Sequence, residues 1–99
     1  RTVYCATKHA VEGMSKAIAA ELAPENIRSN CIGPTFLETP MTAPMFENPE
    51  FRQFVMDRIP MGRLGKISDV TGSVVFLASP ASELITGASL TIDGGWTVV

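Results

Sequence analysis

A long helical pattern followed at once by a short apolar strand is the feature that most limits how this chain can fold. Residues 3–22 are rich in alanine, glutamate, lysine and methionine, all of which are good helix formers. Pro24 is expected to end this helix, and residues 27–32 then read as a short strand. A helix of this length joined to a strand is half of a β-α-β unit, so we predict an α/β fold.

The connection after the predicted strand is rich in proline and in apolar side chains. Residues 33–49 hold four prolines and little periodicity, which predicts a loop, and Pro49 can begin a short helix because proline is tolerated at the first helical position. Among the large apolar residues that this segment carries are Met41, Met45, Phe46, Phe51, Phe54 and Met61. We expect either a mobile cover that becomes ordered on ligand binding, or a loop whose apolar side chains dock on the core.

The last third of the chain is predicted to contain one helix and one strand. Ser68 or Asp69 is expected to cap a helix that runs to about residue 78, and residues 89–93 read as the last strand. Asp93 is expected to cap the glycine turn that follows. Trp96 lies close to the end of the chain, where we expect it to pack against another subunit.

Size and charge exclude several classes of protein. The chain has 99 residues, which is one domain at most, and its net charge of −2 gives no reason to expect nucleic acid or an anionic membrane as a partner. No apolar run approaches the roughly 18 residues needed to cross a bilayer. The chain opens at Arg1, inside a helical pattern, so we expect it to be part of a longer polypeptide.

Two cysteines, Cys5 and Cys31, are too few for a disulfide framework and suit a reducing cytoplasm. Neither has a histidine or cysteine neighbour at metal-ligand spacing, so no metal site is predicted. Both are interpreted as small buried residues.

Tyr4 and Lys8 form a Tyr-x-x-x-Lys motif in the first predicted helix. Four residues advance about 400° around a helix, so these two side chains share a face one turn apart. Further residues within about 40° of Tyr4 on this helix are Val11, Ser15, Ile18 and Leu22. The face that carries the pair is therefore expected to turn toward the protein.

Proton transfer by a tyrosine would explain this pair. A free phenol has a pKa of about 10, and lowering it by about three units means favouring the phenolate by roughly 4 kcal/mol. One cation about 4 Å away, at an effective dielectric constant of about 20, supplies about that much, and Lys8 is placed to be that cation. Such a tyrosine can give a proton to a carbonyl oxygen or take one from an alcohol. The motif alone also fits an ordinary helix with a packed ring and a solvated ammonium.

Five sequence blocks place the motif in a wider context. In chain order they read YCATKHAV, IRSNCIGPTFLETPM, GRLGKISDV, VVFLAS and ITGASLTIDGGW. Over essentially all 99 residues they resemble the C-terminal portion of a short-chain dehydrogenase/reductase. The resemblance implies that residues 1–99 are part of a single Rossmann-type, doubly wound parallel domain. It also implies hydride transfer between NAD or NADP and a carbonyl or alcohol.

The resemblance assigns roles to six residues. Tyr4 resembles the catalytic acid/base, and Lys8 resembles the lysine that lowers the tyrosine pKa and binds the nicotinamide ribose. The other four positions resemble the cofactor-binding segment and are Pro34, Thr35, Leu37 and Thr39. Thr35 stands where a glycine is more usual, Leu37 is the position whose backbone meets the nicotinamide carboxamide, and Thr39 is the one whose hydroxyl does so. Ligands bind after strand ends in such folds.

Two functions remain open at this stage. The first is an NAD(P)-dependent oxidoreductase acting on a sugar or polyol, a 3-oxoacyl thioester or a cyclic alcohol. The second is a dehydrogenase-like scaffold that binds a nucleotide or a partner without turnover. The glycine-rich loop, catalytic serine and structural asparagine of the family lie upstream of this sequence, so we expect the chain to be inactive alone. Asn30 is interpreted as structural and His9 as a packing or surface residue.

We expect a homotetramer, in part because members of the family pair through the corresponding helices. The small residues on the first helix away from Tyr4 are Ala10, Gly13, Ala17 and Ala20, and they would let a second helix approach closely. The last strand is short and uncharged before Asp93, and residues 96–99 are apolar, so both are better covered by a partner. Two self-complementary surfaces on one subunit give a closed tetramer of D₂ symmetry.

Overall fold

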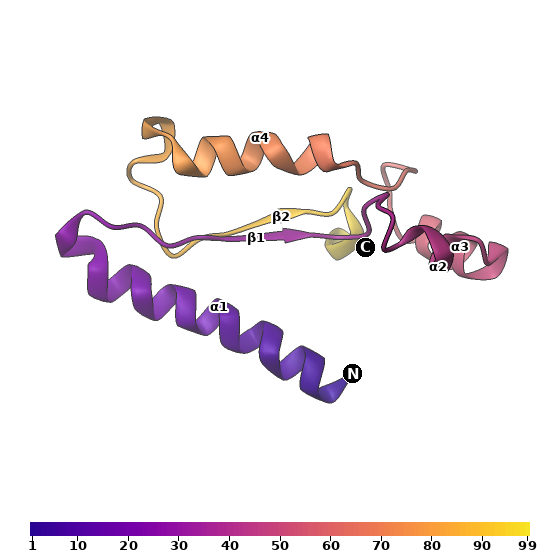
Figure 1. The fold of residues 1–99 in the computed structure, drawn as a ribbon, viewed down its shortest axis with the longest axis horizontal. Helices are drawn as coiled ribbons and strands as arrows, with labels where there is room; N and C mark the ends of the chain where they lie inside the picture. The colour runs from indigo at the N-terminus through magenta and orange to yellow at the C-terminus, as the bar shows by residue number, and fades with distance from the viewer. The chain divides into compact units, whose positions relative to one another are not determined.

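The structure, a computed structural model, describes all residues from 1 to 99, and they form two compact units. The first unit comprises Arg1–Ile32 and Phe76–Leu90, and the second comprises Gly33–Val75 and Thr91–Val99. Strands β1 (Cys31–Pro34) and β2 (Ser89–Ile92) pair with each other, and each contributes residues to both units (Figure 1).

The two strands run in parallel, as the α/β prediction requires. In the first unit, the amide of Cys31 donates to the carbonyl oxygen of Ala88 at 2.8 Å. In the second unit, the amide of Thr35 donates to the carbonyl oxygen of Ile92 at 3.2 Å. Each strand advances by four residues between these bonds in the same direction, which is the register of a parallel ladder.

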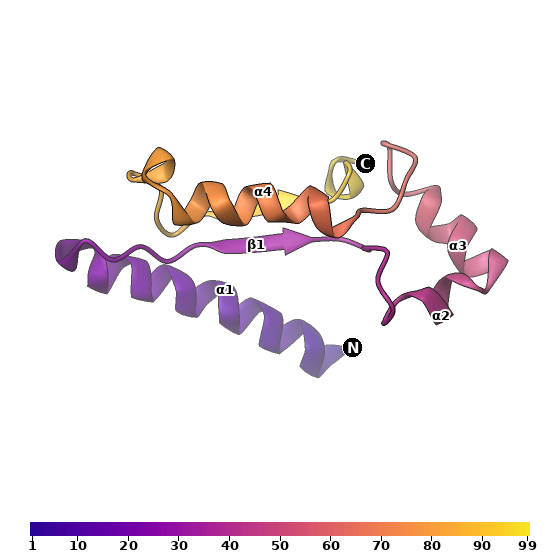
Figure 2. The ribbon, with the colours of Figure 1, turned by 45° about the horizontal axis from the view of Figure 1, so that its top comes forward.

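Helix α1 (Thr2–Leu22) dominates the first unit and begins one residue before the predicted boundary. It is followed by the 3₁₀ helix η1 (Ala23–Glu25), which contains Pro24, and by Asn26 in the left-handed conformation with φ of 59°. Asparagine tolerates this conformation better than most residues do, so it can reverse the chain here. After η1 the chain runs back along α1 (Figures 1 and 2).

The strand predicted over residues 27–32 is wrong in its boundaries, because β1 begins only at Cys31. The residues before it are held by their side chains instead of by a ladder. The side-chain amide of Asn30 donates to the carbonyl oxygen of Ile85, and its Oδ1 accepts from the amide of Ala88, both at 3.0 Å. The hydroxyl of Ser29 lies 2.8 Å from that of Ser15 on α1. Asn30 is therefore structural, as predicted.

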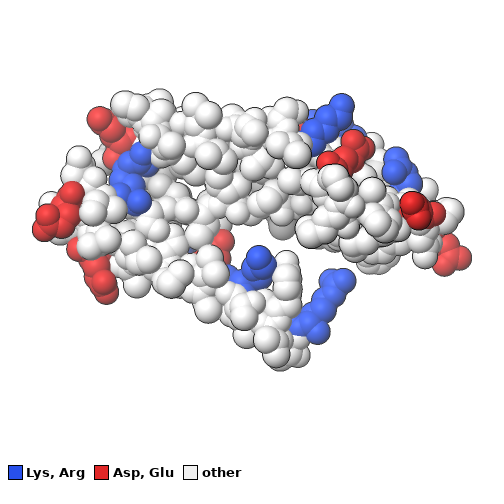
Figure 3. Space-filling view, viewed as in Figure 1, with Lys and Arg blue, Asp and Glu red and all other residues white.

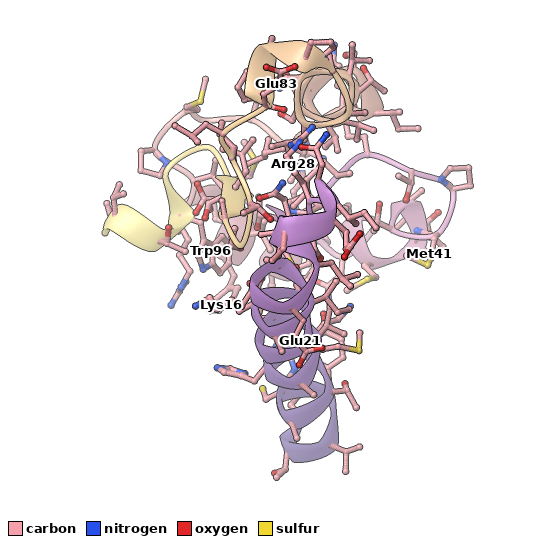
Figure 4. The ribbon with its side chains drawn as sticks, turned by 90° about the vertical axis from the view of Figure 1, so that its left-hand side faces the viewer. Lys16, Glu21, Arg28, Met41, Glu83 and Trp96 are labelled. Atoms are coloured by element: carbon pink, nitrogen blue, oxygen red, sulfur yellow. The ribbon has the colours of Figure 1, made fainter.

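Arg28 joins the returning chain to the end of helix α4 (Ile67–Ala78). Its guanidinium donates to the carbonyl oxygens of Leu77 at 2.6 Å and Ile85 at 3.0 Å, and Figure 4 shows the side chain directed at this region. The last carbonyls of a helix carry partial negative charge and lack partners within the helix, so a cation stabilises them. The buried hydroxyl of Ser82, in the 3₁₀ helix η2 (Pro80–Ser82), lies within bonding distance of the carbonyls of both Phe76 and Leu77.

The second unit contains two short helices, α2 (Ala43–Phe46) and α3 (Pro49–Met56), which lie against each other (Figure 2). Helix α3 begins at Pro49, as predicted. Asn48 caps it, because its side-chain oxygen accepts from the amides of Glu50 at 2.9 Å and Phe51 at 3.2 Å.

A small apolar core holds the second unit together. Its buried residues are Val55, Ile59 and Leu64. Packed against them are Phe36, Phe46, Phe51, Met56 and Trp96. The docked alternative therefore holds for only part of the proline-rich segment. Phe46 and Phe51 pack on this core, and the other four apolar residues named in the prediction are exposed: Met41, Met45, Phe54 and Met61.

Trp96 begins the 3₁₀ helix η3 (Trp96–Val98), and its ring centroid lies 5.7 Å from that of Phe36. Trp96 thus packs within its own unit and remains half-buried, and its expected contact with another subunit stays a prediction. Val98 and Val99 beyond it are exposed.

The start of α4 also differs from its prediction. The helix begins at Ile67, so Ser68 and Asp69 both lie inside its first turn and neither precedes the helix. The Asp69 carboxylate accepts from the backbone amide of Lys66 at 2.7 Å, which is the reach-back half of a capping box. In the same unit, Asp93 caps the glycine turn as predicted, accepting from the amides of Gly95 at 3.0 Å and Thr97 at 2.9 Å.

Gly94 can be tested as a position that tolerates no side chain. It has φ of 61°, and a Cβ atom there would lie 2.7 Å from Cγ2 of the buried Ile59. We expect Gly94→Ala to lower the free energy of unfolding of the full-length protein by about 2–3 kcal/mol, from the left-handed backbone and overpacking together. Urea denaturation measures this change.

Gly72→Ala in α4 is the matched control, because no atom lies within 4 Å of the added Cβ. Alanine is the better helix former, so this variant is expected to be neutral or more stable by up to about 1 kcal/mol. Equal unfolding midpoints for the two alanine variants would contradict the packing described for Gly94.

Charged side chains of both signs are interspersed on the face shown in Figure 3. None of the helices has both the length and the apolar composition that a membrane span requires.

Candidate active site

Tyr4 and Lys8 lie together on the first turns of α1. The Nζ atom of Lys8 sits over the Tyr4 ring, 5.4 Å from the ring centroid. This contact confirms that the two side chains share a face of the helix. An ammonium at this distance from an aromatic face is attracted to its π electrons, which orders both side chains.

The expectation that this face is turned inward along its whole length is wrong for this chain. Tyr4 is 62% exposed, and every residue from 1 to 11 is exposed. Burial begins at Ser15 and Ala19, where α1 meets the segment around Ser29 and the turn at Gly87. The phenol and the ammonium are accordingly accessible to a small molecule.

The neighbours of the pair make only local contacts. The Thr7 hydroxyl donates to the carbonyl oxygen of Tyr4, and Nδ1 of His9 lies at bonding distance from the carbonyl oxygen of Cys5, both at 2.8 Å. His9 is exposed, so of its two predicted roles the surface one applies. Cys5 is also exposed and Cys31 is half-buried, so the interpretation of both cysteines as buried residues is wrong.

The predicted cofactor segment lies in the second unit and begins where β1 ends at the exposed Pro34. Leu37 forms a parallel bridge with Gly65. In this bridge the amide of Gly65 donates to the carbonyl of Phe36 at 3.0 Å, and the amide of Glu38 donates to the carbonyl of Gly65 at 2.8 Å. The amide of Leu37 faces away from Gly65 and donates to no group of the chain, so it is free to bind a ligand.

Thr39 is fixed by a residue that sequence reasoning missed. Thr42 accepts from the amide of Thr39 at 3.1 Å, and their two hydroxyl oxygens are also 3.1 Å apart. The Thr42 hydroxyl donates in turn to the carbonyl oxygen of Leu37. The sequence does contain a pattern that indicates this contact: Thr39 and Thr42 are three residues apart with a proline between them. Threonine hydroxyls at such spacing commonly bond to nearby backbone groups in turns.

Thr35 and Leu37 line a cavity of about 150 Å³ in the second unit. Arg63 and Asp69 form a two-point ion pair beside them, with N–O distances of 2.7 and 2.9 Å. The hydrogen bond from Arg63 holds the pKa of Asp69 well below its usual range, and the same bond raises the pKa of Arg63. Asp93 also lines the cavity, and hydrogen bonds from the hydroxyl of Thr97 and from backbone amides lower its pKa. All three groups are thus charged and already paired.

A larger and more open groove, of about 570 Å³, borders the residues that follow Leu37 in the same segment. Its polar lining residues are Glu38, Thr39, Thr42, Glu47 and Arg52, and its apolar ones are Pro40, Ala43, Phe46 and Leu64. Thr39 therefore borders a space that is large enough for part of an organic ligand.

Comparison with known proteins gives a consistent result. The family model described as enoyl-(acyl carrier protein) reductase matches residues 1–97. The chain is 44% identical over 95 residues to galactitol 2-dehydrogenase (L-tagatose-forming) from Cereibacter sphaeroides. The match covers 96% of this chain and 37% of that protein.

Two solved structures are similar along nearly the whole chain. One, from Agrobacterium tumefaciens, is assigned as a 2-deoxy-D-gluconate 3-dehydrogenase and has NADP bound. It is 38% identical with a TM-score of 0.94, and the match covers 97% of this chain and 39% of that one. The other is 4-hydroxyisoleucine dehydrogenase complexed with NADH, which is 33% identical with a TM-score of 0.95, covering 100% and 41%. The chain thus spans about two fifths of the length of these proteins, and the predicted Rossmann-type α/β class is confirmed.

Proposed function

The chain belongs to the short-chain dehydrogenase/reductase family, and on that premise we propose that the full-length protein is an NAD(P)-dependent oxidoreductase. It would move a hydride between the nicotinamide and a carbonyl or alcohol, with Tyr4 as acid/base and Lys8 as its cationic partner. The single observation that carries this proposal is the position of the Lys8 ammonium over the exposed Tyr4 ring, 5.4 Å from its centroid.

Tyr4 can account for the proton in both directions of the reaction. When an alcohol is oxidised, the phenolate oxygen of Tyr4 takes the hydroxyl proton while the hydride leaves the neighbouring carbon. The nicotinamide supplies the hydride acceptor when it is bound. In reduction the phenol returns its proton to the developing alkoxide, and the Lys8 charge stabilises the phenolate that results.

The cofactor segment supports the same proposal from the second unit. We propose that Pro34, Thr35, Leu37 and Thr39 hold the nicotinamide, since the free amide of Leu37 can donate to a carboxamide oxygen. The Thr39 hydroxyl can bond to the carboxamide nitrogen. NAD and NADP both remain candidates, because one similar structure carries NADP and the other NADH.

A sugar or polyol is the substrate class we favour, because both the galactitol and the deoxygluconate enzymes are named for such molecules. The competing class is an acyl thioester, after the description of the matching family. The test is turnover by the full-length protein with NAD⁺ or NADP⁺ and a panel of hexitols, pentitols and aldonic acids. The competing class is tested in a second assay, with 3-oxoacyl thioesters and NADH or NADPH. Reduced nicotinamide is followed by absorbance. Turnover of none of these compounds would refute the oxidoreductase.

We further propose a cytoplasmic homotetramer. The two cysteines are unpaired, and the small residues of α1 that face away from Tyr4 are all exposed, as are Val74, Val75 and Phe76 on α4. Exposed apolar surface of this kind is better covered by a partner. Light scattering on the full-length protein is expected to give four times the subunit mass, and a monomer at micromolar concentration would rule out both predicted interfaces.

A further inference from the structure

We propose that Thr42 is a positioning residue, which sets the direction of the Leu37 and Thr39 groups that would meet the nicotinamide carboxamide. The inference rests on the proposed function, because it concerns the same cofactor segment. Thr42 would act through Leu37 and Thr39 and has no assigned role at the reacting atoms.

The hydroxyl of Thr42 connects the two cofactor positions. It donates to the carbonyl oxygen of Leu37 and accepts from the amide of Thr39 at 3.1 Å. A hydroxyl has one hydrogen and two lone pairs, so the Thr39 hydroxyl, 3.1 Å away, can serve only as the donor in the remaining bond. These three bonds use the single hydrogen and both lone pairs of the Thr42 oxygen, and the carbonyl oxygen of Thr39, 3.2 Å away, can only share that same hydrogen.

The arrangement makes the Thr39 hydroxyl a hydrogen-bond acceptor toward a ligand. Its hydrogen is directed to Thr42, so the Thr39 oxygen presents its lone pairs, one of which meets the Thr42 amide at 3.3 Å. The remaining lone pair can accept from the NH₂ group of a carboxamide. The Leu37 amide, which is free, can donate to the carboxamide oxygen. One donor and one acceptor side by side match a primary amide.

Backbone bonds alone do not fix the direction of the Thr39 hydrogen. The amides of Thr42 and Ala43 both donate to the carbonyl oxygen of Thr39, at 3.1 and 2.9 Å, so the turn itself would survive loss of the hydroxyl. The Leu37–Gly65 bridge would survive as well. Removing the Thr42 hydroxyl is therefore expected to leave the fold in place. The Leu37 carbonyl would lose this hydrogen-bond donor, and the Thr39 hydroxyl hydrogen would be free to rotate.

The test compares two ligands on three proteins. The dissociation constants of NAD⁺ or NADP⁺ and of the matching 3-acetylpyridine dinucleotide, in which a methyl group replaces the NH₂ group, are measured by calorimetry. The full-length wild type is expected to bind the natural cofactor about 3- to 10-fold more tightly than the analogue, the usual worth of one hydrogen bond. In Thr42→Val this ratio is expected to fall to about 1, and in Thr42→Ser, which keeps the hydroxyl, to return to the wild-type value.

The controls separate positioning from general loss of structure. Thr71→Val removes an exposed hydroxyl that lies 3.4 Å from the carbonyl oxygen of Ser68 on α4, and it should leave the ratio unchanged. Thr42→Ala replaces the valine variant if valine unfolds the protein. A wild-type ratio in Thr42→Val or Thr42→Ala, even with both ligands weakened equally, would overturn the inference alone. A wild type that binds neither dinucleotide would overturn the proposed function, and the inference with it.

Discussion

Tyr4→Phe is expected to lower kcat of the full-length protein by about 10²–10⁴-fold while leaving cofactor affinity nearly unchanged. The substitution removes one oxygen from an exposed ring and keeps the face over which Lys8 lies. Only proton transfer should then be lost. Steady-state kinetics gives kcat, and titration with the dinucleotide gives the affinity.

Val3→Ala is the control for this experiment, because Val3 precedes Tyr4 on α1 and is 76% exposed. It should keep wild-type activity. Retention of more than about a tenth of the activity in Tyr4→Phe would remove the catalytic assignment, since a positioned acid or base contributes more than that. An equal loss in both variants would indicate damage to the helix and not to the chemistry.

The sequence predicted well those features that depend on neighbouring residues. The bounds of α1 followed from its helix-forming composition and from Pro24, and α3 begins at the proline that favours a first helical position. The Tyr4–Lys8 contact also follows from helical spacing alone. Asp93 was recognised as a cap because the glycines next to it require a turn.

The failures concern partners that are distant in the chain. Residues 27–30 have a strand-like pattern, yet Arg28 and Asn30 bond to a turn more than fifty residues away, which periodicity cannot reveal. The contact of Trp96 with Phe36, sixty residues earlier, was not predicted either. Thr42 was missed for a related reason, since its importance arises from where the hydroxyl points and not from any repeating pattern.

Lys8→Met is expected to change the pH dependence of the reaction as well as its rate. A phenol without a neighbouring cation ionises near pH 10, so only about one molecule in 10³ is phenolate at pH 7. Alcohol oxidation at pH 7 should accordingly fall by about 10²–10³-fold. It should recover as the pH is raised toward 10, because the phenol then loses its proton without help from a neighbouring cation. Cofactor affinity should fall as well, through the ribose contact that membership of the family implies for Lys8.

Lys16→Met supplies the matched comparison, because Lys16 is an exposed lysine on the same helix, two turns further along. It removes the same charge from the same element but is distant from the phenol, so both its rate and its pH profile should match the wild type. Methionine retains a long side chain and a good helix propensity, so neither variant should unfold α1. If the residual activity of Lys8→Met followed the wild-type pH profile, the ammonium would have no electrostatic role in proton transfer, whatever the size of the rate loss.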